Sequence, residues 1–442
     1  MVPDPGADAD VDAEADASTS TAREFAERFL EEAFSDAAEL LAADGRDAVV
    51  DAFPEGFRRG EMDAEDALTE FRYGLYGQYG PVEGVGEVTA DDSDVTVELR
   101  FADGSHDLEL AVADGAVVDF ALPSEYEPPA YADPDAFAER DVTVDAGDVE
   151  LDGVLAVPEG DGPFPGAVLV HGAGLHDPDG TAGNSKILKD VAWGLASEGV
   201  AVLRYEKRLN DHEPDPENFT FDEVVVEDAV AAVDELAAAS RVDADSLFVA
   251  GHSQGGWAAP RVADYHGDVA GVVNLDGSPD PTPDPDDDFE FLRYSIEPDG
   301  DLDEDQEEQF EAMREPFERV AAGDYDPGEE VLGKPGRWHD SLRDCDPVAR
   351  LESVDAPAFV AKAGRADPEA QADIVEFHEE TLAEWRDADL GDRGRVECYE
   401  DVGHYFQEGH EPTTMAHLYF ADNAEGYVVA DVADWIREVA DA

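Results

Sequence analysis

A serine flanked by glycines lies where the sequence pattern changes from strand to helix. Residues 246–250 are mostly apolar and predict a buried strand, and residues 257–259 open a helical run. Gly251, Ser253 and Gly255 therefore fall on a strand-to-helix turn, the context that a nucleophile elbow requires. The flanking residues must be small, because a Cβ there would strike the neighbouring backbone. The pattern predicts a serine hydroxyl exposed for nucleophilic attack, with an ordinary turn as the alternative.

A serine hydroxyl is a poor nucleophile at neutral pH and needs a histidine to take its proton. His404 is the candidate base, because it lies in a loop directly after the predicted strand 396–399. His410 and His417 are nearby alternatives, the first in a polar loop and the second in a predicted helix.

The histidine in turn needs a carboxylate that accepts a hydrogen bond from its other ring nitrogen. Asp367 follows the predicted strand 358–363 and lies between Ser253 and His404 in chain order, so we favour it as the triad acid. Asp276 ends the strand after the serine turn and is the rival, either as acid or as a structural cap. Asp401 lies too close to His404 along the chain.

An oxyanion hole needs two backbone N–H groups that point at one position. Gln254 follows the serine at the start of a helix and can supply one of them. The other is expected from the glycine-rich loop after strand 167–170, at Gly172 or Ala173. His171 in the same loop is expected to be structural rather than a base.

The elements that position these residues alternate between strand and helix from residue 142 onward, which indicates a parallel sheet. An antiparallel start is predicted at 142–144 and 149–157, and the short apolar strand 167–170 is typical of a sheet covered on both faces. Residues 277–349 interrupt the alternation with a Pro/Asp run and a helical pattern. An insertion at this point would cover the active site as a cap.

The first part of the chain has a different organisation. Residues 1–20 have almost no large apolar side chains and predict a disordered acidic tail. Residues 21–122 predict helices followed by an antiparallel sheet, which is a small α+β domain. The proline-rich residues 123–139 predict a linker to a hydrolase domain over residues 140–442. We therefore expect the fragment 126–442 to fold and work without the first 125 residues.

Acidic residues are spread along the whole chain, with 111 Asp and Glu against 28 Lys and Arg and a net charge of −83. Disorder does not fit, because 43% of the residues are hydrophobic and many fall in regular patterns. The composition resembles that of proteins from salt-accumulating haloarchaea, in which concentrated salt screens the repulsion between carboxylates. Binding to nucleic acid or to anionic membranes is not expected.

Two cysteines, Cys345 and Cys398, argue against a disulfide framework or a cysteine-based metal site, and we expect no metal and no cofactor. We see no signal peptide pattern and no apolar run of ~18 residues, so a cytoplasmic protein is expected. The oligomeric state stays open.

Several motifs resemble a family of α/β-hydrolase esterases that are often described as dienelactone-hydrolase-like or as relatives of the bile-acid acyltransferase C-terminal domain. They include residues 171–177, 184–186, 190–196, 202–208, 332–335 and 342–347. The resemblance implies an α/β-hydrolase fold and cofactor-free hydrolysis of a small-molecule carboxylic ester by Ser, Asp and His. It places the acid in a Gly-Arg-Asp segment, where Ala366 here separates Arg365 from Asp367. Residues 21–122 resemble a small domain, of nuclear-transport-factor-2 type, that precedes certain bacterial α/β-hydrolases.

Other interpretations of the same residues stay open. Arg204, Lys207 and Arg208 could bind an anionic substrate, but internal ion pairs are favoured in so acidic a protein. A serine peptidase or a thioesterase would use the same Ser253 and His404. A non-catalytic ligand-binding protein is the alternative from another class.

Overall fold

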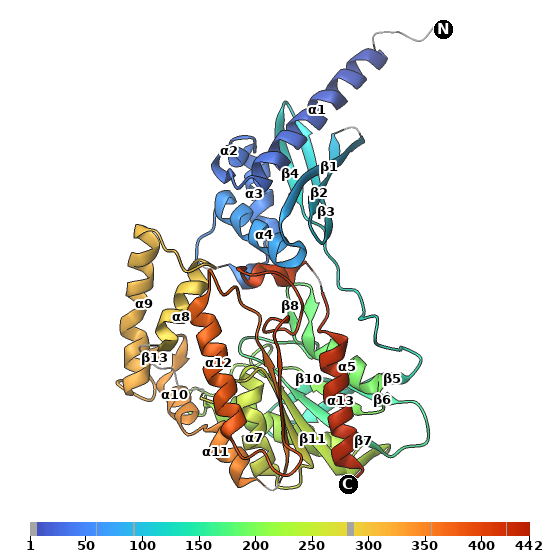
Figure 1. Cartoon of the computed structure of the whole chain (residues 1–442), viewed down its shortest axis with the longest axis vertical. Coiled ribbons are helices and arrows are strands. Elements are labelled where there is room, and N and C mark those ends of the chain that lie inside the picture. Colours follow the sequence, from blue (N-terminus) through green and yellow to red (C-terminus); the bar gives the residue numbers. More distant parts are fainter. Residues whose placement is uncertain (1–6, 59, 92, 281–286, 355, 421) are drawn as a thin grey trace. The chain divides into compact units, whose positions relative to one another are not determined.

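A computed structural model of the chain describes residues 7–442 apart from 59, 92, 281–286, 355 and 421 (Figure 1). Its contacts divide the chain into two compact units. The N-terminal unit holds the chain up to Tyr126 together with Ala182–Ser185 and Gly409–Asp422. The hydrolase unit holds Glu127–Thr181, Lys186–Glu408 and Asn423–Ala442.

The N-terminal unit consists of helices followed by an antiparallel meander of strand order β1-β2-β3-β4. Asp63 is the N-cap of the helix α4 and forms a capping box. Its side chain accepts the backbone N–H groups of Glu65 and Asp66, and the Asp66 side chain accepts the backbone N–H of Asp63. The elements are α1 (Ala7–Leu30), α2 (Phe34–Glu39), α3 (Ala43–Ala52), η1 (Glu55–Phe57), α4 (Ala64–Tyr79), β1 (Val82–Asp91), β2 (Asp94–Phe101), β3 (Gly104–Ala113) and β4 (Ala116–Ala121).

The helix α1 corrects the prediction of a disordered tail over residues 1–20. It already begins at Ala7, and residues 1–6 lie outside the described residues. Alanine recurs in this segment and has the highest helix propensity. The helix continues into Phe25 and Phe29, which are fully buried in the core of this unit.

A segment from the far end of the sequence completes the same core. Ala416 and Phe420, in and after the short helix η3 (Met415–Tyr419), are buried among side chains of the N-terminal unit, and the ring of Phe420 lies 6.3 Å from that of Phe71. A Cβ added to Gly74 of α4 would lie 2.7 Å from the Ala416 carbonyl oxygen. The predicted boundaries are therefore corrected, since 182–185 and 409–422 do not belong to the hydrolase unit. Deleting residues 1–125 would uncover these side chains, which argues against the expectation of an independent fragment 126–442.

The hydrolase unit is built on an eight-stranded sheet of order β16-β15-β12-β11-β7-β10-β6-β5. Neighbours from β16 to β10 are parallel, whereas β6 is antiparallel to both β10 and β5. The strands are β5 (Phe137–Asp145), β6 (Glu150–Pro158), β7 (Phe164–Val170), β10 (Ala201–Tyr205), β11 (Val242–His252), β12 (Gly271–Leu275), β15 (Ala358–Ala363) and β16 (Arg395–Tyr399). Because β5 begins at Phe137, the predicted linker 123–139 ends earlier than expected.

Helices cover both faces of this sheet, as its apolar strands require. The helices α5 and α13 pack on one face, and α6 and α7 pack on the other. The predicted helix over 221–239 begins as a π-helical turn, η2 (Asp222–Val226), before it continues as α6. The bounds are α5 (Ile187–Ser197), α6 (Glu227–Ala237), α7 (Gln254–His266), α12 (Ala372–Asp387) and α13 (Gly426–Ala440), with short strands β8 (Thr181–Ala182) and β9 (Ser185–Lys186).

The insertion between β12 and β15 is mainly helical. Phe289, Phe310 and Phe317 form a small apolar core of its own between two of its helices. Its elements are α8 (Asp287–Ile296), α9 (Glu304–Ala322), β13 (Glu330–Val331), β14 (Lys334–Pro335), α10 (Gly336–Arg343) and α11 (Pro347–Ser353).

Candidate active site

Ser253 lies between the end of β11 and the start of α7 with φ 54° and ψ −117°. This left-handed backbone conformation is strained for a residue that has a side chain, and such strain gathers at functional sites. A Cβ on Gly251 would collide with the backbone of Gly255, and one on Gly255 would collide with the Val170 carbonyl group. The glycines at these positions therefore allow the sharp turn that the spacing predicts.

His404 makes its hydrogen bond with Asp276. Its Nδ1 lies 2.5 Å from Oδ2 of Asp276, which directly follows β12. The strand β12 runs parallel to β11, and its Leu275 accepts a hydrogen bond of 2.9 Å from the backbone N–H of Ser253. The carboxylate and the serine thus follow the ends of two neighbouring strands at the same edge of the sheet.

The Asp276 carboxylate is buried and held from its other side as well. Its Oδ1 accepts hydrogen bonds from Lys362 Nζ at 2.6 Å and from the Ala363 N–H at 3.1 Å. Burial alone would raise the pKa of Asp276, but Lys362 and His404 outweigh it and hold the pKa well below its ordinary value. The group is an ionised acceptor for His404, as a histidine that gains a proton during a reaction requires.

Asp367, which the sequence favoured as the acid, has a different role. Its Oδ1 accepts the N–H groups of Glu369 and Ala370 at 2.7 and 3.1 Å and so caps its own turn. The same loop contacts the histidine loop through Arg365, whose side chain donates to the Gln407 carbonyl. The assignment of His404's partner to Asp367 is therefore corrected to Asp276, because a short Asx turn satisfies Asp367 locally.

His252 is a positioning residue that the sequence analysis did not single out. It directly precedes Ser253, and its Nε2 donates to the backbone carbonyl of His404 at 2.8 Å, with the two rings 4.8 Å apart. Burial lowers the pKa of His252 to about 3, so the ring is neutral and carries one N–H. The sequence signal for this positioning role was the place of His252 directly before Ser253 in the Gly-x-Ser-x-Gly motif. The alternatives His410 and His417 lie in the N-terminal unit, where they contact Asp103 and Thr414.

Two of the predicted oxyanion residues lie beside the serine. A Cβ added to Gly172 would lie 3.5 Å from the Cβ of Ser253, and Gln254 provides the first N–H of α7. Among the described residues, neither Gly172 nor Ala173 uses its backbone N–H in a hydrogen bond. Gly172, Ala173 and Gln254 stay the candidate donors to a developing oxyanion.

The Lys207 side chain holds the glycine-rich loop after β7 in place. Its Nζ donates to the Gly172 carbonyl at 2.6 Å and to Oε1 of Gln254 at 3.0 Å. In a trans peptide the carbonyl and the following N–H point in opposite directions, so this bond turns the Ala173 N–H away from Lys207. His171 donates to the Tyr205 carbonyl and is buried, with its pKa well below the ordinary value, which fits the structural role expected for it.

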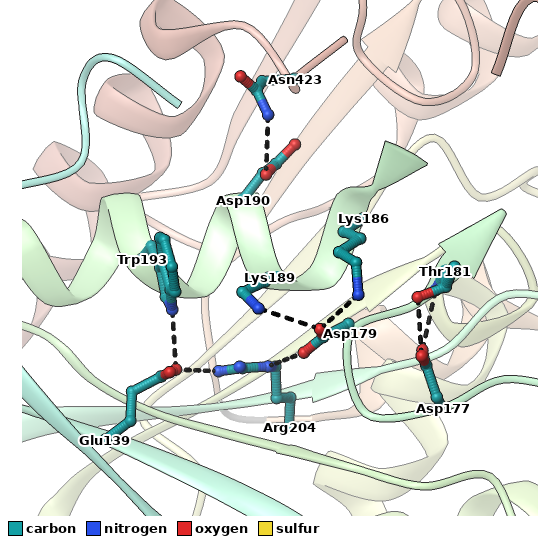
Figure 2. Close-up of polar contacts among 10 residues, drawn as sticks. All are labelled: Glu139, Asp177, Asp179, Thr181, Lys186, Lys189, Asp190, Trp193, Arg204 and Asn423. Atoms are coloured by element: carbon teal, nitrogen blue, oxygen red, sulfur yellow. Dashed lines mark hydrogen bonds and ion pairs between the residues drawn. The ribbon is translucent and has the colours of Figure 1, made fainter. Parts of the chain in front are cut away.

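The two arginines of the basic stretch form internal ion pairs, as favoured from the sequence. Arg204 lies between Glu139 at 2.5 Å and Asp179 at 3.0 Å, and Asp179 also holds Lys186 and Lys189 (Figure 2). Arg208 pairs with the buried Asp228 at 2.5 Å. Lys207 differs from both, because it has no carboxylate partner among the described residues.

The described residues contain no group of three His, Cys, Asp or Glu side chains arranged to hold a metal ion. In the same part of the chain, no helix is both long enough and apolar enough to cross a membrane.

A family model described as "Alpha/beta hydrolase family" matches residues 167–418, which is more than half of the chain. The chain belongs to this family. It is 32% identical over 318 residues to the esterase EstD of Thermotoga maritima, covering 72% of this chain and 71% of that protein. It is also 34% identical over 135 residues to the putative esterase NocK of Nocardia uniformis, which is 28% of this chain and 35% of the relative. Among solved structures, the esterase of Pyrobaculum calidifontis matches at 21% identity with a TM-score of 0.44, covering 69% of this chain and 84% of that one.

The family match agrees with the mostly parallel sheet of the hydrolase unit, and a small antiparallel sheet precedes it in the chain. The family model and the relative EstD support a hydrolase related to esterases.

Proposed function

We propose that the chain is a serine hydrolase that cleaves carboxylic esters through an acyl-enzyme on Ser253. The proposal rests above all on one observation: the hydrogen bond of 2.5 Å between His404 and the buried Asp276, beside the strand that ends at the strained Ser253. A buried ionised carboxylate paired with a half-exposed histidine is the arrangement that supports proton transfer from a serine hydroxyl. The name of the relative EstD makes an ester the first substrate class to test.

In the proposed reaction, His404 takes the proton of the Ser253 hydroxyl while Oγ forms a bond to the ester carbonyl carbon. The carbonyl oxygen gains the negative charge, and the N–H groups of Gln254 and of Gly172 or Ala173 stabilise it. His404 then gives the proton to the departing alkoxide as the acyl-enzyme forms. Water repeats the sequence, with His404 as base, and releases the carboxylic acid. Asp276 stabilises the imidazolium that forms in each half.

Replacing Ser253 with alanine should remove nearly all hydrolysis of 4-nitrophenyl butyrate, because loss of a nucleophile can lower kcat by ~10⁶. The assay is release of 4-nitrophenolate in molar KCl. The matched control is Ser278→Ala, since Ser278 lies in the loop after β12 and its hydroxyl donates to the Asp280 carbonyl. A Ser253→Ala variant that keeps activity within about tenfold of the parent would refute a serine nucleophile.

The same parent and variant should be tested with a thioester and an aminoacyl anilide. Faster Ser253-dependent cleavage of either one than of any ester would reassign the enzyme to the thioesterases or the peptidases. Absence of turnover of all three classes would favour a ligand-binding protein without catalysis.

A further inference from the structure

A cavity of about 330 Å³ adjoins the candidate oxyanion groups. Ala173, Gly174 and Gln254 form one wall of it, and residues of the insertion, from α9 to α10, form the opposite wall. Aromatic and aliphatic side chains such as Trp257, Trp338 and Leu342 supply most of its surface. A substrate whose reacting carbonyl occupied the oxyanion hole would place a neighbouring group in this cavity.

The charged side chains that line the cavity are basic, whereas the protein as a whole is strongly acidic. Asp and Glu make up 111 of the 442 residues, yet no carboxylate lines this cavity. The chain has only five lysines, and two of them, Lys207 and Lys334, are lining residues. The other three pair with Asp179 or Asp276.

Neither lining lysine has a carboxylate partner among the described residues, and Lys334 has no hydrogen-bond acceptor there either. Its ammonium group makes no hydrogen bond or ion pair with any described residue and lies 5.2 and 5.1 Å from the ring centres of Phe219 and Trp338. Two ring faces hold the ammonium group at the cavity by cation–π attraction but satisfy none of its three N–H donors. The chain has about four times as many acidic as basic residues, so a half-buried lysine without a carboxylate partner is unusual in it. An anionic ligand would supply the missing partner.

Two further donors belong to the same lining. The indole Nε1 of Trp257 is buried and has no acceptor among the described residues. Lys207 uses two of its three N–H donors, on Gly172 and Gln254. Lys207 and Lys334 also lie close enough to repel each other, since Lys334 adds to the lowering of the pKa of Lys207 that burial causes. An anion between them would relieve this repulsion and accept the free donors.

We propose that this cavity binds a carboxylate carried by the substrate on a small apolar body, and that Lys334 selects for it. The proposal deepens the function proposed above and rests on it. The net charge of −83 does not prevent binding in concentrated salt, because the Debye length at ~1 M is ~3 Å and a contact with a half-buried lysine is screened far less than distant carboxylates are.

The carboxylate can belong to the acyl part or to the alcohol part of the ester, and two pairs of substrates distinguish them. Monomethyl glutarate carries a carboxylate on the acyl chain, and methyl hexanoate is its neutral partner. The ester 4-(butanoyloxy)benzoate carries one on the alcohol, and phenyl butyrate is its neutral partner. Product release is followed by chromatography in molar KCl.

In one of the two pairs, Lys334→Met should lower kcat/KM for the anionic ester about tenfold or more, the size expected when a charged hydrogen bond is lost. The neutral partner should change less than about twofold, and Lys334→Arg should retain the preference. The control is Lys189→Met, which removes the same charge from the Asp179 network outside the cavity. Equal losses on anionic and neutral esters, or no loss on either anionic ester, would overturn the proposal.

Binding is measured separately from turnover in the Ser253→Ala background, by the fluorescence of Trp257 and Trp338 during titration with monomethyl glutarate and 4-(butanoyloxy)benzoate. Saturable quenching by one of them that Lys334→Met abolishes supports the cavity even if no ester is cleaved. No quenching by either, in a parent enzyme that hydrolyses neutral esters, would refute the cavity proposal and leave the role of Ser253 standing.

Discussion

The carboxylate partner of His404 could not be identified from residue types alone. Asp276 and Asp367 both follow a predicted strand and both lie between Ser253 and His404 in the chain, so chain order does not separate them. What separates them is strand adjacency: β12 neighbours β11, whereas β15 is one strand further away. A sequence signal did exist in Lys362, a lysine inside the apolar strand β15. A buried lysine needs a counter-ion, and Asp276 is that counter-ion.

Asp276→Asn should lower kcat on a 4-nitrophenyl ester by up to ~10⁴, because an amide would favour the wrong tautomer of His404. Asp367→Asn should leave kcat nearly unchanged, since it alters only a local turn. Both variants are assayed on the same ester after their circular dichroism has been compared with the parent. A crippled Asp367→Asn beside a near-normal Asp276→Asn would restore the assignment made from the sequence.

The pKa of Asp276 also makes a prediction about stability and pH. Because this pKa is lower in the folded than in the unfolded chain, the unfolded chain binds the proton more readily. The resulting stabilisation is present above the unfolded pKa of about 3.9 and is lost as the pH falls toward the folded pKa. The free energy of unfolding of the parent should therefore fall more steeply below about pH 4 than that of Asp276→Asn. Parallel curves for the two proteins would contradict the ion pair.

At the scale of elements, most strands and helices could be predicted, because alternating and helical apolar patterns report local burial directly. The predicted strands 358–363 and 396–399 agree closely with β15 and β16. The membership of 409–422 could not be predicted. Its apolar residues Ala416 and Phe420 read as part of the closing hydrolase sequence, and nothing local tells which core they enter. Only the packing against α4 shows it.

Gly74→Ala tests that packing. Alanine would normally stabilise a helix interior by about 1 kcal/mol relative to glycine. Here the added Cβ would meet the Ala416 carbonyl oxygen at 2.7 Å, so we expect the midpoint of thermal unfolding to fall by several degrees. Gly56→Ala is the control, because its Cβ would enter open space. A Gly74→Ala variant as stable as the parent would mean that 415–419 does not pack on α4.

At the scale of the whole molecule, the charge of −83 dominates the solution behaviour we expect. Internal ion pairs such as Arg208–Asp228 and Lys362–Asp276 use much of the small number of cations. Most surface carboxylates are therefore left to repel one another, and salt must screen them.

Stability should accordingly fall as KCl is lowered from molar to millimolar concentration, because the Debye length grows from ~3 Å at 1 M to ~30 Å at 0.01 M. The measurement is the midpoint of thermal unfolding across a KCl series, with sucrose as a control for effects of excluded cosolute. A midpoint that does not change with KCl would contradict salt adaptation.

The most direct test of the account as a whole is labelling by a fluorophosphonate, which reacts only with an activated serine, followed by mass spectrometry of the peptides. The account predicts one modified residue, Ser253, with a labelling rate that falls by orders of magnitude in Asp276→Asn and stays near the parent rate in Asp367→Asn. Absence of label on Ser253 in a folded protein, or label on another serine, would contradict it.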